Sequence, residues 1–242
     1  MNQPHFDPVA LVPRPVRTGN AFEETMERLL QGLKLGIYSA GSKLPAEREL
    51  AEQLGVSRAT LRDALAELQT AGYLQSRRGR YGGTFAVSVL PEVSAPSRAR
   101  GQGASADDVE DILLFRNVVE PAAARLAAEA TLVPDARAHL LAMLAEVDGA
   151  GTDTFRPKDS RFHIAVAELT GSPSLVAAVA DTRARVSDLL DRIPLLQTNL
   201  DHSHTQHRQL ADAILRGDGA AAEAAAVVHL EGTARLLRGF LT

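Results

Sequence analysis

The sequence predicts a mostly α-helical protein in two parts, the first of which ends in a small β-hairpin. Three observations lead to this prediction. Apolar residues recur at helical spacing along most of the chain. A stretch rich in Ser, Ala, Pro and Gly, at 88–106, interrupts that pattern. Beyond it, short Gly, Pro and Asp turns separate six helical stretches, which implies an all-α antiparallel helical bundle.

The composition is that of a globular protein, with 45% hydrophobic and 23% charged residues. The chain has no cysteine, which excludes disulfide frameworks and thiolate chemistry. Its apolar runs fall far short of the ~18–20 residues that span a membrane, so no membrane partner is expected. Segment 1–19 lacks the apolar core of a signal peptide; we expect a disordered tail and a cytoplasmic location.

Residues 20–87 are predicted to hold three helices followed by a β-hairpin. Glycines end each helix, and Pro45 and Ser57 suit the first turn of the second helix and the N-cap of the third. Two short strands then flank a Gly-rich turn. The apolar stripes of the helices lie within 22–33, 50–54 and 61–68, and the strands at 73–75 and 84–87.

Residues 88–106 are predicted to be a linker, and 107–242 a second, all-helical domain. Pro194 has no amide N–H and should kink or divide the fourth helix of this domain. The six predicted helices span 107–131, 134–148, 155–171, 173–199, 201–216 and 219–240.

The charge of the chain is unevenly distributed. The net charge is −4, but residues 1–90 carry +2 and residues 101–242 carry −7. This asymmetry favours an anionic polymer as a partner of the first part only.

The second and third predicted helices, joined at Gly55-Val56, form a helix-turn-helix arrangement. The apolar stripe of the third helix faces the core, so Arg58 and Arg62, spaced i,i+4, share another face. Arginine can read a guanine edge in the major groove of double-stranded DNA. The hydroxyls of Ser57 and Thr60 suit phosphate contacts.

Spacing alone leaves a second explanation open for these arginines. They can be ordinary surface residues that pair with Asp63 or Glu67. The turn at 78–83 is expected to form a wing that reaches a neighbouring groove or the DNA backbone.

Residues 20–87 resemble the winged helix-turn-helix of the GntR superfamily. The resemblance rests on Leu44 to Ala51, Leu54 to Arg58, Thr60 to Leu65, Leu68, Gly72-Tyr73-Leu74 and the Gly-rich wing. It implies that Arg48 contacts the DNA backbone, that Arg58 and Arg62 read bases, and that Ser57 and Thr60 touch phosphates. It also implies that Gly79, between Arg78 and Arg80, lies at the wing tip in the minor groove. Ala59 departs from a frequent Thr.

Four residues of the second domain form a candidate metal site. Asp159 and His163, spaced i,i+4 on one predicted helix, share a face, and a carboxylate and an imidazole at this spacing can share a metal ion. His207 and His229 each lie 11 residues from Asp218, so both stand about 16 Å from the turn between their helices. Neutral imidazoles with one carboxylate suit Zn, Ni, Mn or Co and leave positions open for water or an anion.

The alternative is that these histidines are surface or core residues without a ligand. His139 is expected to be of that kind. His202 and His204 lie close to His207 in the sequence, and spacing alone does not decide which of the three faces inward.

Residues 107–240 resemble the FCD ligand-binding domain of the FadR-like GntR branch. The resemblance rests on Arg116 to Glu120, Ala127-Ala128, Asp159 to His163, Leu169, His207, Ala213-Ile214, Gly217-Asp218 and Ala225 to Leu230. It implies that Asp159, His163, His207 and His229 bind a divalent metal, which selects His207 from its neighbours. Arg116 then faces a pocket and binds a carboxylate effector, or else pairs with Glu120. Gly171-Ser172 departs from the frequent Gly-Asn.

Together these features predict a homodimeric transcriptional repressor that binds a near-palindromic operator and responds to a small organic acid. It is not expected to be an enzyme. Two alternatives remain for the second domain: a metal-dependent hydrolase that activates water, and a purely structural dimerisation bundle whose histidines are incidental.

Overall fold

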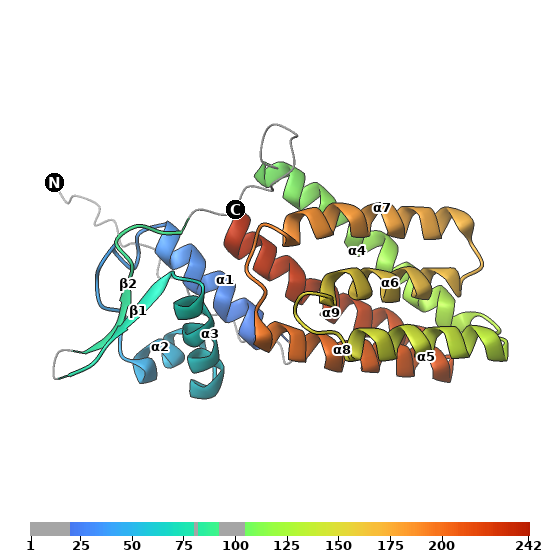
Figure 1. Cartoon of the computed structure of the whole chain (residues 1–242), viewed down its shortest axis with the longest axis horizontal. Helices are drawn as coiled ribbons and strands as arrows, with labels where there is room; N and C mark the ends of the chain where they lie inside the picture. Colours follow the sequence, from blue (N-terminus) through green and yellow to red (C-terminus); the bar gives the residue numbers. More distant parts are fainter. Residues whose placement is uncertain (1–19, 80–81, 92–104) are drawn as a thin grey trace, which may run out of the picture.

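The computed structural model describes residues 20–79, 82–91 and 105–242. It confirms the predicted fold class: a small helical head with one β-hairpin stands at one end of an all-helical bundle (Figure 1). None of the helices in these described ranges is long and apolar enough to cross a membrane.

The head contains the predicted three helices and hairpin. A left-handed Gly55 ends α2, and Ser57 caps α3 by accepting a hydrogen bond from the Thr60 amide at 3.0 Å. The hairpin is antiparallel, with Leu74 opposite Ala86 and Arg77 opposite Gly83. The head elements are α1 (Ala21–Lys34), α2 (Glu47–Leu54), α3 (Arg58–Thr70), β1 (Leu74–Arg77) and β2 (Gly83–Ala86).

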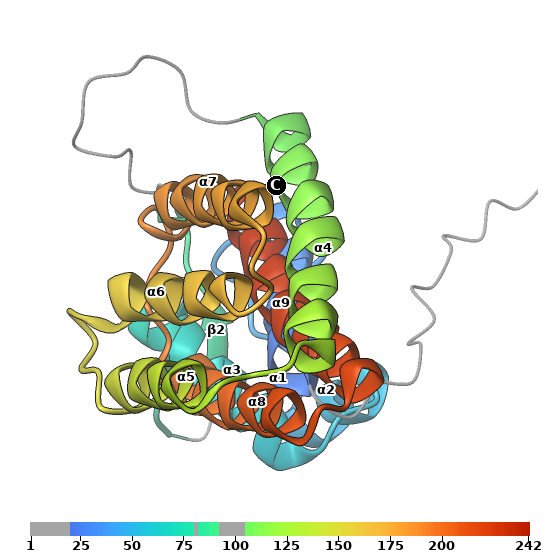
Figure 2. The same ribbon diagram turned by 90° about the vertical axis from the view of Figure 1, so that its right-hand side faces the viewer.

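The bundle begins at a capping box, in which the Ser105 side chain and the Asp108 carboxylate bond each other's backbone amides. Helix α9 packs against α4, α8 and the head helix α1, and Figure 2 shows α4 crossing beside α6 and α7. The bundle elements are α4 (Ala106–Glu129), α5 (Pro134–Asp148), α6 (Phe155–Glu168), α7 (Pro173–Leu190), α8 (Gln197–Arg216) and α9 (Gly219–Leu241).

Pro194 was expected to kink or divide the fourth helix of the second domain, and the structure shows a division. The predicted helix 173–199 does not exist as one element: α7 ends at Leu190, and the next helix begins at Gln197 rather than at the predicted residue 201. Proline removes one backbone donor and restricts the residue before it to extended conformations, so the chain leaves the helix here.

A single apolar cluster joins the head to the bundle. It contains buried side chains of α1 and α3 together with those of α7 and α9, and Tyr73 of the head meets Phe240 of α9 edge-on at 5.6 Å between ring centroids. Glycine makes the close approach of α1 and α9 possible: a Cβ atom at Gly239 would lie 3.0 Å from the Cα of Glu27. The two parts are therefore packed together, beyond their covalent connection.

Candidate metal centre and nucleic-acid interface

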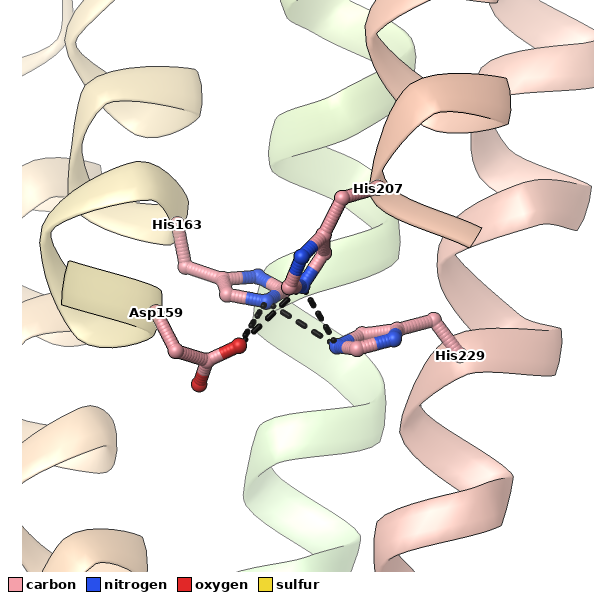
Figure 3. Close-up of side chains that lie close together, drawn as sticks. All are labelled: Asp159, His163, His207 and His229. Carbon is pink, nitrogen blue, oxygen red and sulfur yellow. Dashed lines mark hydrogen bonds and ion pairs between the residues drawn. The ribbon is translucent and has the colours of Figure 1, made fainter. Parts of the chain in front are cut away.

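The four residues of the candidate metal site converge in the middle of the bundle. Asp159 and His163 project from α6, His207 from α8 and His229 from α9, and all four side chains are buried (Figure 3). Their ligand atoms all lie within 4.8 Å of one another. The left-handed Gly217 turns α8 back into α9, which brings the two histidines of this helical hairpin level.

Three of the distances between these atoms match those between adjacent ligands of one metal ion. The Nε2 atom of His229 lies 3.1 Å from that of His163 and 3.2 Å from that of His207. The Oδ1 atom of Asp159 lies 3.1 Å from His207 Nε2 and 3.8 Å from His163 Nε2. Two ligands held about 2.0–2.2 Å from a zinc-like ion at 90–110° are roughly 2.8–3.6 Å apart. The donor set therefore fits a divalent ion at its centre.

Hydrogen bonds behind the imidazoles orient two of them. His163 Nδ1 lies 2.8 Å from the Glu120 carboxylate, and His229 Nδ1 donates to the Gln206 side-chain oxygen at 3.1 Å. A proton held at Nδ1 leaves Nε2 with a free lone pair, as a metal ligand requires. Two such lone pairs 3.1 Å apart repel each other unless a cation lies between them.

The ionisation states also suit a metal ion. Burial raises the pKa of Asp159, but Arg183 and the adjacent imidazoles outweigh it and hold that pKa well below its usual range. Burial, assisted by Arg183, lowers the pKa of His163 to about 4. Burial and the other two imidazoles hold the pKa of His229 well below its usual value. At neutral pH the carboxylate is charged and these imidazoles are neutral, which are the ligand forms that bind metals.

A layer of buried charged residues backs the site. Arg116 Nε donates to Glu120 Oε1 at 2.9 Å, so the arginine pairs with Glu120 as the second interpretation expected. Arg183 pairs with Asp159 and lies 3.9 Å from Glu120. Within the described residues, Arg116 Nη1 and the Nε and Nη1 atoms of Arg183 are buried without a hydrogen-bond partner. Donors of this kind are costly to leave unpaired and suit an anion.

Sequence reasoning missed Arg183 and the contact of Glu120 with His163. A signal for Arg183 was present, because it occupies a position of the apolar stripe of α7, between Val179 and Val186. A charged residue in such a stripe is rarely buried without a partner. Its partner on α6 was not predictable from α7 alone.

The other histidines of the bundle lie outside the quartet. His139 pairs with Glu168 on the surface, at 2.9 Å. His204 packs against the Phe155 ring. His202 faces the head, where its Nδ1 lies 3.0 Å from Glu23 of α1.

The arginines of α3 are exposed, as a DNA-reading surface requires. Arg58 has no ion pair within the described residues. The ion pair considered for Arg62 exists with a different partner: its Nε lies 2.6 Å from Glu47 of α2, and neither Asp63 nor Glu67 is involved. Since both side chains remain about half exposed, water can replace this pair at low cost.

The remaining residues of the predicted DNA surface lie around α3 and at the hairpin. Arg48 is exposed and lies 3.7 Å from Glu52. Arg78 and Gly79 are exposed at the hairpin tip, whereas Arg80 lies outside the described residues. The guanidinium of Arg77, to which the sequence assigned no separate role, lies 4.4 Å from the centre of the Phe85 ring and makes a cation–π contact between β1 and β2.

A helix-turn-helix head with a wing, seated on a helical bundle, is the architecture of a DNA-binding transcriptional regulator. The model of the gntR family of bacterial regulatory proteins matches residues 22–85, and the FCD domain model matches residues 111–232. The chain belongs to the GntR family and carries an FCD domain.

Three relatives illustrate this membership. The "Putative HTH-type transcriptional regulator RmpR" of Mycobacterium gastri is 36% identical over 160 residues, which are 63% of this chain and 56% of that protein. The "Putative L-lactate dehydrogenase operon regulatory protein" of Escherichia coli K12 is 35% identical over 199 residues, or 79% and 76% of the two chains. The "HTH-type transcriptional repressor NanR" of Citrobacter rodentium is 30% identical over 226 residues, or 90% and 85%.

Proposed function

We propose that this regulator is a homodimeric repressor whose bundle binds one divalent metal ion and a small organic acid. The observation that carries the proposal is the buried quartet of three imidazole Nε2 atoms and one carboxylate oxygen. Zn, Ni, Mn and Co all accept this donor set. When bound, the ion supplies a Lewis-acidic position for an anionic ligand.

The charges around the quartet support an anionic effector. Arg116 and Arg183 balance Glu120 and Asp159, so these four buried side chains have no net formal charge. A divalent ion raises the buried charge to about +2, which is costly in a low-dielectric interior. A carboxylate ligand offsets this charge and gives the unpartnered N–H groups of the two arginines an acceptor.

We assign the DNA contacts to the exposed surface of α3 and the wing. Arg58 reads a base directly, and Arg62 reads a second base after leaving Glu47. The backbone contacts belong to Arg48, Ser57 and Thr60, and the wing contacts to Arg78, Gly79 and Arg80. The Ser57 hydroxyl already accepts a hydrogen bond from the Thr60 amide. We therefore expect the phosphate to contact the N-terminus of α3 as well as this hydroxyl.

The homodimer proposal is supported by an exposed apolar stripe on α4. Leu114, Val118 and Leu126 repeat at four- and eight-residue intervals and are 68%, 61% and 40% exposed. A patch of this kind on a soluble protein suits burial against a second copy. Two copies related by a two-fold axis place two α3 helices on a near-palindromic operator in the cytoplasm. The repressor role is supported by the similarity to NanR, which is named as a transcriptional repressor.

The metal is tested by calorimetric titration of Zn²⁺ into the chelator-treated full chain and into His207→Ala. We expect one ion per chain for the unmodified protein and none at the quartet in the variant, because a ligand is lost. His139→Ala is the matched control, since His139 is an exposed histidine outside the quartet.

A DNA duplex selected from a random pool supplies the second measurement. We expect His207→Ala to bind this operator as the metal-free unmodified protein does. Equal Zn²⁺ binding by the protein and the variant refutes the site, and absence of stoichiometric metal favours the purely structural bundle instead.

A further inference from the structure

Helix α8 contacts the metal quartet and the DNA-binding head at the same time. His207 points into the quartet, while a strip of polar side chains on another part of the helix contacts the head. This head-facing strip consists of Thr198, Asn199, His202 and Gln206. Each of the four has a hydrogen-bond partner on α1, on α3 or at the N-cap of α1.

The first link reaches the recognition helix itself. Glu67 of α3 accepts hydrogen bonds from the backbone N–H of Thr198 at 3.2 Å and from its hydroxyl at 3.3 Å. Thr198 lies in the first turn of α8, where an acidic side chain satisfies free amides and favours the helix dipole. His207 follows nine residues later on the same helix, about 13–14 Å away. One rigid helix, α8, therefore connects a metal ligand to α3, the proposed DNA-reading helix.

The second link is a buried chain of hydrogen bonds. The Gln206 side-chain oxygen accepts from His229 Nδ1 at 3.1 Å, and its Nε2 donates to Asn20 Oδ1 at 3.0 Å. Asn20, the residue that precedes α1, donates in turn to the backbone carbonyl of Val228 at 2.7 Å. A rotation of the His229 ring therefore displaces the N–H donor that fixes the Gln206 side chain, and through Gln206 it affects Asn20 at the start of α1.

The third link holds α1 against α8. Glu23 is 1% exposed, and its Oε1 atom accepts from Asn199 Nδ2 at 3.2 Å and lies 3.0 Å from His202 Nδ1. A shift of α8 that broke these contacts while Glu23 stayed buried would leave the carboxylate without those partners, which carries a desolvation penalty. The head is therefore expected either to move together with α8 or to dissociate from the bundle.

We propose that α8 couples the metal quartet to the head, with Gln206 as the positioning residue that joins His229 to Asn20. This inference rests on the proposed metal binding. A ligand that favours one orientation of His229 or His207 favours one seating of the head, and such coupling works in both directions. The continuous set of contacts supports this proposal, and a measurement of the coupling between Zn²⁺ binding and operator binding tests it.

The test measures the selected operator duplex by fluorescence anisotropy, with and without saturating Zn²⁺. For the unmodified chain we expect the operator Kd to change by about 5–150-fold on Zn²⁺ binding. Asn20→Ala removes the acceptor of Gln206 on the head, and Gln206→Glu keeps an acceptor for His229 but loses the N–H donated to Asn20. Both variants should keep most of their Zn²⁺ affinity, without the about 10–100-fold loss that is typical when a hydrogen-bond partner of a metal ligand is removed. Both should lose the change in operator Kd that Zn²⁺ causes.

Lys34→Ala is the matched control. Lys34 also joins α1 to the bundle, through a hydrogen bond to the Phe240 carbonyl at 2.9 Å, but lies outside this chain of contacts. It should retain the linked change. If Asn20→Ala and Gln206→Glu retain it as well, the coupling through Gln206 is refuted.

Hydrogen exchange separates this inference from the function on which it rests. Zn²⁺ should alter amide protection at the start of α1 as well as around the quartet. Zn²⁺ binding with no change in α1 protection and no change in operator affinity overturns the coupling and leaves the metal site standing. Failure to bind Zn²⁺ overturns both.

Discussion

Two ion pairs on α4 have the same spacing and opposite environments, and comparing them measures how burial changes the contribution of such a pair to stability. Arg116–Glu120 and Arg125–Glu129 are both i,i+4 pairs, at 2.9 and 3.0 Å. The side chains of the first pair are 2% and 3% exposed, and those of the second are 41% and 49% exposed. Removing the glutamate of each pair therefore breaks the same kind of ion pair, once in an apolar interior and once in water.

We expect Glu120→Ala to lower the free energy of unfolding of the metal-free protein by about 3–5 kcal/mol, because it leaves Arg116 and Arg183 without their shared buried counter-charge. At about 2–4 °C per kcal/mol for a chain of this size, the midpoint of thermal unfolding falls by roughly 6–20 °C. Glu129→Ala should cost only about 0.2–0.5 kcal/mol, as exposed helical pairs do.

Calorimetry or circular dichroism of both variants, on metal-free protein at neutral pH, gives the comparison. Glu120→Gln serves as an isosteric variant and should fall between the two alanine variants, because its amide oxygen still accepts a hydrogen bond but carries no charge. If Glu120→Ala proves no less stable than Glu129→Ala, the buried layer is not held together by charge pairing, and the electrostatic argument for an anionic effector fails with it.

Two further predictions concern the head. Arg58→Ala should weaken operator binding by about 1–3 kcal/mol and relax sequence preference at one base position, measured by anisotropy on single-base variants of the duplex; a loss that is equal at all positions would mean a phosphate contact instead. The hydrogen bond to Glu23 raises the pKa of His202, against the effect of burial, and Asp201 and Asp63 add to the rise. This stabilisation is complete below the ordinary histidine pKa of about 6.5 and is lost as pH rises through the raised folded value. The gap in unfolding midpoint between the protein and His202→Gln should therefore narrow from pH 6 to pH 8.5, and a constant gap would contradict this assignment.

The local elements were predictable because their determinants lie within a few residues. Ser57 at the start of α3 and Gly55 before it gave the helix-turn-helix boundary, and both have the cap and left-handed conformations expected of them. Helix boundaries near Pro194 were less predictable. The proline indicates an interruption, but only packing decides that residues 191–196 leave the helix and that α8 begins at Gln197.

The candidate site was predictable in part for the same reason. Asp159 and His163 share a helical turn, and the equal distances of His207 and His229 from their turn follow from helix geometry alone. The surroundings came from other helices. Arg183 reaches Asp159 from α7, and Gln206 reaches Asn20 across the boundary between the two parts of the chain. No periodicity within one helix reports such long-range pairs.

Seating of the head directly on the backbone of α9 has a consequence for operator architecture. At Gly239 no side chain separates α9 from α1, so the seated head rests directly against the backbone of the bundle. In the proposed homodimer, the distance between the two half-sites that seated heads read on DNA is then set by the way two bundles meet. The number of residues that connect head to bundle has little influence on it, so this stretch is free to vary in length while the spacing of the DNA target stays the same.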